Sequence, residues 1–491
     1  MSFAFRTLIK IAGLITGITG IAMLAPMMCA FYYGETKTAI AFVITCPISV
    51  VVGFLIFFFM KPSKHALKTR DGYLVVIFCW IACSFFGAIP YMLSGQVPSI
   101  IDAIFESVSG YTTTGASTLP DSCLSNSLLL WKATTHWLGG MGILIFIISI
   151  LPSLGIGSQR LAAAEAPGAG LLSAAPSARD LSRSLYFIYI SFTIVEFVLL
   201  WQGSSMGALE ALINTLGCIS TSGLFLHSGG VLFYHSVFVE IVISVFTLLA
   251  SCNFLIYIYI IQRNFNMVKN NLEIRVFGMI VAGATLIIAV SLYATGTFKT
   301  FGESLLRSFF QVSAFASSSG YSIGDYSVWP TFCQGILFIL FFVGGCTAST
   351  SGSIKVLRVI VMFKLINRGF YKRLHPRAAR AVKLNGKAMP ARAVAAISTF
   401  IFMYFATFLI FSLVLSLQGL DLETTLSATA SLMSTTGIGF GDIGAAGNYS
   451  VFCPALRLFM SLIMLVGRLE LFTIFLLFFP SFWNPNRAKI K

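Results

Sequence analysis

Residues 431–442 read Ser-Leu-Met-Ser-Thr-Thr-Gly-Ile-Gly-Phe-Gly-Asp, a stretch rich in hydroxyl side chains and glycine that lies between two long apolar runs. Its backbone polar groups would find no hydrogen-bond partners against lipid, so it must be buried in protein or line a wet path. Similar phrases occur earlier: Tyr-Thr-Thr-Thr-Gly at 111–115, Ile-Ser-Thr-Ser-Gly at 219–223 and Ala-Ser-Ser-Ser-Gly-Tyr at 316–321. The matching part of the opening stretch is Ser-Thr-Thr-Gly at 434–437. We call these four stretches the four glycine phrases.

The composition is that of a membrane protein. The chain has 491 residues, of which 57% are hydrophobic and only 10% are charged, and its mean hydropathy is +0.89. Many of its apolar runs reach the roughly 20 residues that a membrane-spanning helix requires. The sequence therefore predicts an all-α polytopic membrane protein.

The positive charge follows the expected topology. The net charge is +15, and 26 of the 32 lysines and arginines fall at the two termini or in alternate loops. Such alternation is the positive-inside pattern, so these loops and both termini are expected in the cytoplasm. The charge is thereby explained by a multi-pass protein that lies in a lipid bilayer and has no nucleic-acid partner.

Ten spans are predicted, and every glycine phrase falls between two of them on the outer side. The phrase glycines are 108 (115 to 223), 97 (223 to 320) and 117 (320 to 437) residues apart, which indicates an internal repeat. The predicted spans cover about 11–33, 39–60, 73–94, 127–151, 185–201, 231–261, 276–295, a stretch from 331, 393–417 and 451–480. The predicted units are a two-span extension at 1–70 and repeats at 71–182, 183–270, 271–390 and 391–491.

A short helix is expected before each phrase. Asp102 and Glu210 precede their phrase glycines by the same spacing (102 to 115 and 210 to 223), and Glu423 lies one position further from its own (423 to 437). In the third repeat Glu303 lies further still from the glycine at 320, and Arg307 takes the place equivalent to that of Asp102. Acids suit a helix N-terminus, and the negative C-terminal ends of four such helices would then point at the phrases. Convergence of these ends predicts a cation site.

The phrases themselves supply the ligands. Glycine permits conformations that aim successive carbonyl groups the same way, and rings of carbonyls replace the hydration shell of an ion in potassium filters. Because no phrase contains an acid, a weakly hydrated monovalent ion is favoured over calcium or magnesium. Packing of small residues between helices is the alternative. The predicted ion-binding residues are Thr113, Thr114, Gly115, Ser220, Thr221, Ser222, Gly223, Ser318, Ser319, Gly320, Thr435, Thr436 and Gly437.

Several motifs carry a family resemblance: Phe-Glu-Ser-Val-Ser-Gly at 105–110, His-Trp-Leu-Gly-Gly-Met-Gly at 136–142, Ala-Glu-Ala-Pro-Gly at 164–168, the fourth phrase and Gly-Arg-Leu-Glu-Leu-Phe at 467–472. With these the whole chain resembles the pore-forming subunits of the Trk/Ktr/HKT superfamily of potassium transporters, most closely the bacterial Trk type. The resemblance implies four span–pore helix–span repeats in a pseudo-fourfold arrangement plus two extra N-terminal spans. It also implies potassium as the transported ion and no cofactor.

The resemblance bears on selectivity as well. A serine in place of the first phrase glycine marks sodium-preferring relatives, and all four glycines are present here. Ser222 stands where many relatives have a second glycine, and three serines precede Gly320. These departures keep open a sodium-permeable or non-selective monovalent cation channel of the same architecture.

The predicted eighth span is interrupted by Gly-Gly-Cys-Thr-Ala-Ser-Thr-Ser-Gly-Ser at 344–353, which we call the gate loop. Broken backbone at membrane depth is tolerated where it lines a cavity. The resemblance implies a loop beneath the filter that obstructs the pore, with Gly344, Gly345 and Gly352 as flexible points. A packed kink is the alternative.

Arg468 lies deep in the last span, where a charge is costly and suggests function. We expect it beneath the filter, as an electrostatic barrier and as an anchor for the gate loop. A structural salt bridge with Glu470 or with Glu196 is the alternative. Two other groups in the spans, Lys132 and His136, are expected to be interfacial or packing residues.

The outer face carries two further expectations. Asp325 and Asp442 follow the third and fourth phrases, and we expect them to attract cations at the pore mouth. The ten cysteines show no metal-ligand spacing, and a disulfide among Cys123, Cys333 and Cys453 stays open.

The basic segment 355–392 is expected to attract anionic lipid, and the resemblance adds a dock for a cytosolic nucleotide-binding regulatory subunit and a homodimer. The chain has no nucleotide-binding motif of its own. We therefore predict potassium uptake through a carbonyl-lined filter, gated by the gate loop and by that subunit. A membrane-embedded enzyme is disfavoured because no catalytic constellation is present. A transporter built from inverted repeats is disfavoured because all four repeats share one orientation.

Overall fold

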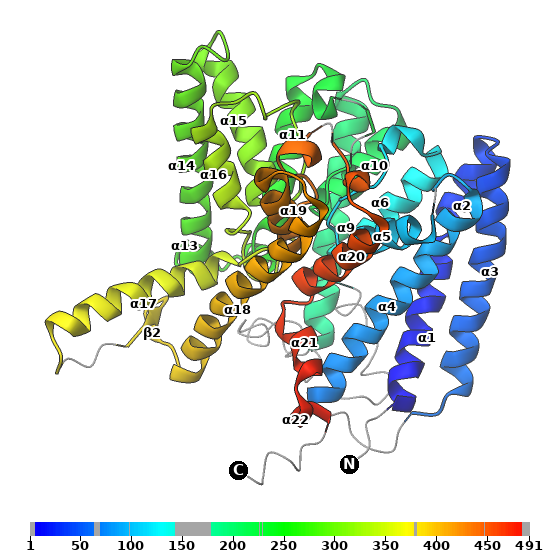
Figure 1. The fold of residues 1–491 in the computed structure, drawn as a ribbon, viewed down its shortest axis with the longest axis horizontal. Coiled ribbons are helices and arrows are strands. Elements are labelled where there is room, and N and C mark those ends of the chain that lie inside the picture. Colours follow the sequence, from blue (N-terminus) through cyan, green and yellow to red (C-terminus); the bar gives the residue numbers. More distant parts are fainter. Residues whose placement is uncertain are drawn as a thin grey trace.

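The computed structural model describes residues 5–62, 69–97, 99–142, 178–224, 226–227, 229–377, 381–445 and 447–483. Nearly all regular structure in these residues is helical (Figure 1). The one sheet in the described part is a hairpin of two short strands, β1 (Lys383–Leu384) and β2 (Lys387–Ala388). The all-α prediction is therefore confirmed.

The first two predicted spans form a closely packed helical pair. The first is α1 (Phe5–Ala22) continued by α2 (Leu24–Tyr32), and the second is α3 (Thr36–Phe59). A side chain at Gly53 would overlap the backbone of Gly13 and Gly17 on the facing helix. Small residues at the contact let the two backbones approach, which is a common way of joining helices in lipid.

Six of the predicted spans are helices long and apolar enough to cross a bilayer. They are α1 with α2, α3, α4 (Thr69–Ser94), α9 (Ala178–Gly203), α14 (Leu272–Ala294) and α18 (Ala391–Leu415). The fourth span begins as α6 (Asn126–Gly140), and its predicted continuation from 143 lies outside the described residues, as does the motif at 164–168.

The other three predicted spans are broken. The sixth consists of α11 (Val237–Ser251) and α12 (Phe254–Ile261), bent by 91°, and the tenth consists of α20 (Pro454–Arg468) and a segment from Phe472 to Phe478, bent by 110°. The eighth is α16 (Thr331–Leu340), too short to cross, which leads into the gate loop. The break in the eighth span is the one that the sequence predicts, whereas hydropathy alone does not reveal the bends of the sixth and tenth spans.

Four shorter helices occupy the predicted places before the glycine phrases. They are α5 (Ile100–Tyr111), α10 (Ala208–Ile219), α15 (Phe301–Ala316) and α19 (Leu422–Ser434). Ser99, Thr300 and Asp421 cap three of them by accepting a hydrogen bond from a backbone N–H of the first turn. Each helix carries the expected acid in its first turn: Asp102, Glu210, Glu303 and Glu423. We call these four the pore helices.

The basic segment is more ordered than a loop. Half of it forms α17 (Val356–Leu374), which extends away from the body of the molecule beside α18 (Figure 1). The beginning of α1 and the helix α22 (Pro480–Trp483) lie at one end of the molecule. The remaining short elements are η1 (Asp121–Cys123), η4 (Gly230–Tyr234), α13 (Phe265–Lys269), η5 (Ser416–Gln418), η6 (Gly441–Ile443), η7 (Tyr449–Val451), α21 (Phe472–Phe475) and η8 (Leu476–Phe478).

Candidate functional site

Each pore helix ends where its glycine phrase begins. The C-caps are Thr112, Ser220, Ser317 and Thr435. The four negative helix ends therefore lie at the phrases, as the sequence predicts.

The four phrases share one backbone conformation. In each phrase the residue two positions before the glycine has a positive φ: 55° at Thr113, 53° at Thr221, 55° at Ser318 and 55° at Thr435. The glycine that follows also has a positive φ: 76°, 56°, 68° and 88° along the chain. A left-handed residue other than glycine is costly, and such residues cluster at functional sites. The same strained conformation occurs at the equivalent position of all four phrases, which shows that the fold requires this backbone shape.

The phrase glycines contact one another's segments in a closed ring. A Cβ atom built on any of the four would overlap a backbone carbonyl oxygen of the next phrase. The contacts in order are Gly115 with Ser222, Gly223 with Ser319, Gly320 with Thr436 and Gly437 with Thr114. The tertiary structure thus brings segments from opposite ends of the chain side by side. Each of these positions requires glycine for two reasons: a side chain would strain the positive φ angle, and it would collide with the neighbouring phrase.

Hydroxyl groups support the ring from within each phrase. The side-chain oxygens of Thr112 and Thr114 lie 2.8 Å apart, and those of Ser434 and Thr436 lie 2.7 Å apart. Ser220 and Ser222 make the equivalent contact at 2.9 Å. In the third phrase the Ser319 hydroxyl donates to the carbonyl of Ala314 at 3.3 Å. All of the predicted ion-binding threonines and serines are buried.

In three of the four pore helices, a polar side chain accepts a hydrogen bond from the backbone of the segment that follows the ring. Glu106 Oε1 accepts from the backbone N–H of Thr118 at 2.7 Å, and Gln311 Oε1 accepts from that of Ile323 at 3.2 Å. Ser427 Oγ accepts from the backbone N–H of Phe440 at 3.0 Å. Sequence reasoning did not find these residues, although Glu106 and Gln311 each precede their phrase glycine by the same spacing (106 to 115 and 311 to 320).

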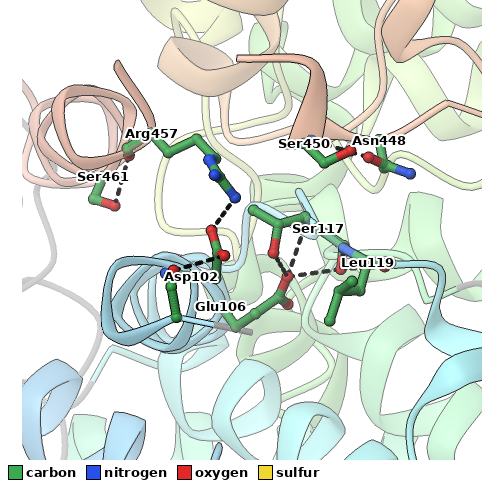
Figure 2. Close-up of polar contacts among 10 residues, drawn as sticks. Asp102, Glu106, Ser117, Leu119, Asn448, Ser450, Arg457 and Ser461 are labelled. Carbon is green, nitrogen blue, oxygen red and sulfur yellow. Dashed lines mark hydrogen bonds and ion pairs between the residues drawn. The ribbon is translucent and has the colours of Figure 1, made fainter. Parts of the chain in front are cut away.

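Glu106 has a buried cation as a second partner. Lys132 Nζ lies 3.0 Å from Glu106 Oε2, and both side chains are almost completely buried. The other carboxylate oxygen accepts from Ser117 Oγ at 2.8 Å (Figure 2). The expectation that Lys132 is an interfacial or packing residue is therefore wrong: it neutralises an acid behind the ring, which burial otherwise makes costly. His136 is fully buried one turn further along α6.

The gate loop lies directly against the ring. The backbone N–H of Gly352 donates to Ser318 Oγ at 2.7 Å, and the side-chain oxygens of Thr350 and Thr221 lie 3.3 Å apart. A side chain at Gly352 would overlap the carbonyl of Ser434 and the hydroxyl of Thr435. The loop thus touches the second, third and fourth phrases.

The loop is also tied to the surrounding helices. Gly345 has little room for a side chain beside Ser251, and Gly344 has little beside Gly352. The backbone N–H of Cys346 donates to the carbonyl of Ser251 at 2.9 Å. Glu273, in the first turn of α14, accepts from the N–H of Thr347 at 2.6 Å and from its hydroxyl at 2.8 Å. These bonds give the loop a defined shape across the break between α11 and α12.

Arg468 joins the gate loop to a neighbouring helix end. Its Nη1 donates to the carbonyl of Thr350 at 2.8 Å, and its Nη2 donates to the carbonyls of Gly139 and Gly140 at 2.6 and 3.1 Å. Glu470, one of the two acids considered as its partner, forms an ion pair with Arg358. The arginine therefore binds backbone oxygens at the end of α6 and in the loop.

The residues expected at the mouth are accessible. Asp325 and Asp442 are both exposed, on the side where the phrases leave the ring. Ser327 donates to Asp325 through its N–H and its hydroxyl, at 2.9 and 2.5 Å. All ten cysteines lie in the described residues and are free, so the open question of a disulfide is answered against one.

An all-helical, multi-span membrane protein is the class that this fold defines. The model of the TrkH family, described as a cation transport protein, matches residues 39–484. The chain is 31% identical over 483 residues to the Trk system potassium uptake protein TrkG of Escherichia coli K12, covering 98% of this chain and 99% of that one. It is 30% identical to TrkH of Halomonas elongata, covering 98% and 100%.

A solved structure matches equally fully. The potassium transporter TrkH from Vibrio parahaemolyticus superposes with a TM-score of 0.87 at 28% identity, covering 98% of this chain and 100% of that chain. The chain belongs to the TrkH family of cation transport proteins. The resemblance to the Trk type is thereby confirmed, and the family is one of transporters rather than enzymes.

Proposed function

We propose that this protein takes up potassium across the bacterial cytoplasmic membrane, through a filter formed by the carbonyl groups of the four glycine phrases. The observation that carries the proposal is the closed ring of contacts among Gly115, Gly223, Gly320 and Gly437. Four negative helix ends meet at this ring, and none of the phrases contains an acid. Carbonyl dipoles with no carboxylate suit a weakly hydrated monovalent cation. The names of the relatives, which are potassium uptake proteins, support the same ion.

The gate loop closes this path in our proposal. The contacts from Thr350 and Gly352 to the ring support this proposal, because a loop held there would obstruct an ion that leaves the filter. Arg468 holds the loop from one side and adds a positive charge next to the path. Opening then requires the loop to leave the ring, with Gly344, Gly345 and Gly352 as its flexible points.

A regulatory partner would act on this loop through α17. This helix begins just after the loop, and its exposed surface combines Phe363, Phe370 and Leu374 with the cations Lys372 and Arg373. An exposed face that is both apolar and basic supports the docking of a cytosolic, nucleotide-binding subunit. The same proposal includes three further features. They are assembly as a homodimer, the repeat boundaries predicted from the sequence, and both termini in the cytoplasm.

Growth of a bacterium that lacks its own potassium uptake systems tests the function. Expression of the chain should restore growth in low-potassium medium and should not increase sensitivity to sodium. Sodium toxicity without rescue would favour the sodium-permeable alternative, to which the serines at 222 and 317–319 point. Absence of both effects, with the protein present in the membrane, would contradict monovalent cation transport altogether.

A further inference from the structure

Two ion pairs cross between neighbouring repeats on the outer side of the ring. Arg457, on α20, pairs with Asp102, on α5, and the two side chains point toward each other (Figure 2). Arg307, on α15, pairs with Glu240, on α11, at 2.6 Å between Nη1 and Oε1. The first pair joins the last repeat to the first, and the second pair joins the second repeat to the third.

The two pairs occupy equivalent places with opposite polarity. Asp102 and Arg307 precede their phrase glycines by the same spacing (102 to 115 and 307 to 320). Arg457 and Glu240 are each the fourth residue of their helix. At one junction the pore helix carries the acid, and at the other it carries the base. The repeated position shows that the place matters and that either order of charges can fill it.

The other two pore helices differ at this position. Glu210, the equivalent residue before Gly223, pairs with His227 of its own repeat at 3.3 Å, and both side chains are substantially exposed. Thr424, the equivalent residue before Gly437, accepts from the N–H of Asp442 at 3.0 Å. At this pore-helix position, in the described part of the chain, ion pairs between repeats therefore stand at alternate junctions of the ring. The ion pair of Arg358 with Glu470, which joins the third repeat to the fourth, involves no pore helix.

Both acids of these pairs are deeply buried. The side chains of Asp102 and Glu240 are 4% and 3% exposed, and those of Arg457 and Arg307 are 13% and 18% exposed. Loss of one partner would leave a charge in a poorly solvated place, unlike the loss of a partner at the surface. The pairs are thus able to fix the distance between the helices that carry them.

A continuous path leads from each pair to the ring. Asp102 and Glu106 lie one turn apart on α5, and Glu106 binds Ser117 and Thr118 just after the first phrase (Figure 2). On α15, Arg307 and Gln311 have the same spacing, and Gln311 binds the N–H of Ile323 after the third phrase. A shift of either pore helix would therefore move the segment that leaves the ring.

The junction of the last repeat with the first has a special need for such a pair. No peptide connection joins these repeats directly, because they lie at opposite ends of the chain. An open apolar groove of about 570 Å³ lies between α4, α5 and α20, lined by Ile81, Ser84, Val108, Leu458 and Leu462 among others. The junction therefore depends on contacts between side chains, of which the ion pair is one.

We propose that the Asp102–Arg457 and Arg307–Glu240 pairs are positioning groups that hold alternate pore helices at a fixed spacing and thereby set how strictly the ring prefers potassium to sodium. This inference rests on the proposed function of the ring. None of the four residues touches the ion, and each acts through its helix on the geometry of the carbonyls.

The test compares neutralised and charge-exchanged variants of the full chain, purified and reconstituted into liposomes. Asp102→Asn and Arg457→Gln should each lower the potassium-to-sodium permeability ratio by about threefold to tenfold, the scale of couplings between contacting charged residues. The exchanged variant Asp102→Arg with Arg457→Glu copies the polarity of the Arg307–Glu240 pair. It should restore the ratio to within about twofold of the original protein.

Two controls separate the outcomes. His227→Gln alters the more exposed contact with Glu210 and should leave the ratio unchanged. If the Asp102 variants do not fold, Arg307→Gln and the exchange Arg307→Glu with Glu240→Arg decide by the same measurement. Folded single variants with an unaltered ratio, or an exchange that restores nothing, would overturn the proposal. A parent protein that shows no potassium preference at all would instead overturn the proposed function.

Discussion

Gly115 excludes a side chain for two separate reasons. Its φ of 76° is a left-handed conformation, and a Cβ atom would overlap the carbonyl oxygen of Ser222. The first reason is local and costs about 1–2 kcal/mol in a residue other than glycine. The second would push aside a carbonyl that we propose as a ligand of the ion, so its effect falls on transport rather than on stability alone.

Gly115→Ala should therefore lower potassium uptake at least about tenfold, whereas Gly419→Ala should retain it. Both substitutions strain the backbone, but only the first displaces a carbonyl that we propose as a ligand of the ion. Gly419 is a matched control, because its φ is 79° and nothing lies within 4 Å of the position of a Cβ atom. Rubidium uptake into liposomes, with both variants at equal protein content, measures the difference. Equal loss in both variants would show that only backbone strain matters.

At the scale of elements, the broken helices surround the gate loop. The break between α11 and α12 offers the carbonyl of Ser251 to Cys346. The loop continues directly into α17. The N–H of Val356, the first residue of α17, donates to the carbonyl of Gly345 in the loop at 3.1 Å. Interrupted helices are tolerated here because the freed backbone groups bond to one another.

Arg468→Gln should increase the ion leak of the purified protein, because the loop then loses a charged donor to the carbonyl of Thr350. Hydrogen bonds to charged groups contribute about 1.5–3 kcal/mol, which corresponds to an increase of about tenfold or more in the open fraction. Passive rubidium efflux from loaded liposomes measures this leak. Lys269→Gln, which removes an exposed cation at the end of α13, is the control. An unchanged leak in the Arg468 variant would exclude both the anchoring and the barrier role.

At the scale of the whole molecule, the protein combines a buried ring with an exposed basic arm. The ring and the gate loop lie in the interior, and α17 connects them to a surface outside the helical body (Figure 1). In the proposed function this connection would let a partner bound at the arm alter the position of the loop without any contact at the ring.

Reversal of the charges at Lys372 and Arg373 should abolish stimulation by a cytosolic regulatory subunit while basal uptake remains. Both residues lie in the last turn of α17 and are exposed, so the fold does not depend on them. Binding of the subunit to the purified protein should weaken as salt rises, because exposed charges are screened. Lys61→Glu, which reverses an exposed charge just after α3, provides the comparison. Unaltered stimulation of the doubly reversed protein would place the partner elsewhere.

Much of the fold follows from the sequence because lipid imposes simple rules. Apolar runs of sufficient length predicted the six long spans, and the hydroxyl-rich phrases predicted the four pore helices with their first-turn acids. The breaks at Asn253 and after Arg468 were missed, since hydropathy records how apolar a segment is and not where its axis bends. Lys132 was misjudged for a similar reason: its partner Glu106 lies on another helix, so no spacing along the chain reveals the pair.

The sequence by itself determined that the chain is a helical membrane protein with four related glycine phrases, because burial in lipid and the conformational freedom of glycine are properties of short segments. Only the tertiary structure decided that Gly437 meets Thr114 and closes the ring, and that Arg457 reaches Asp102 across the length of the chain. These contacts depend on how whole helices pack. Their energies come from charges and carbonyls that approach only when the chain has folded.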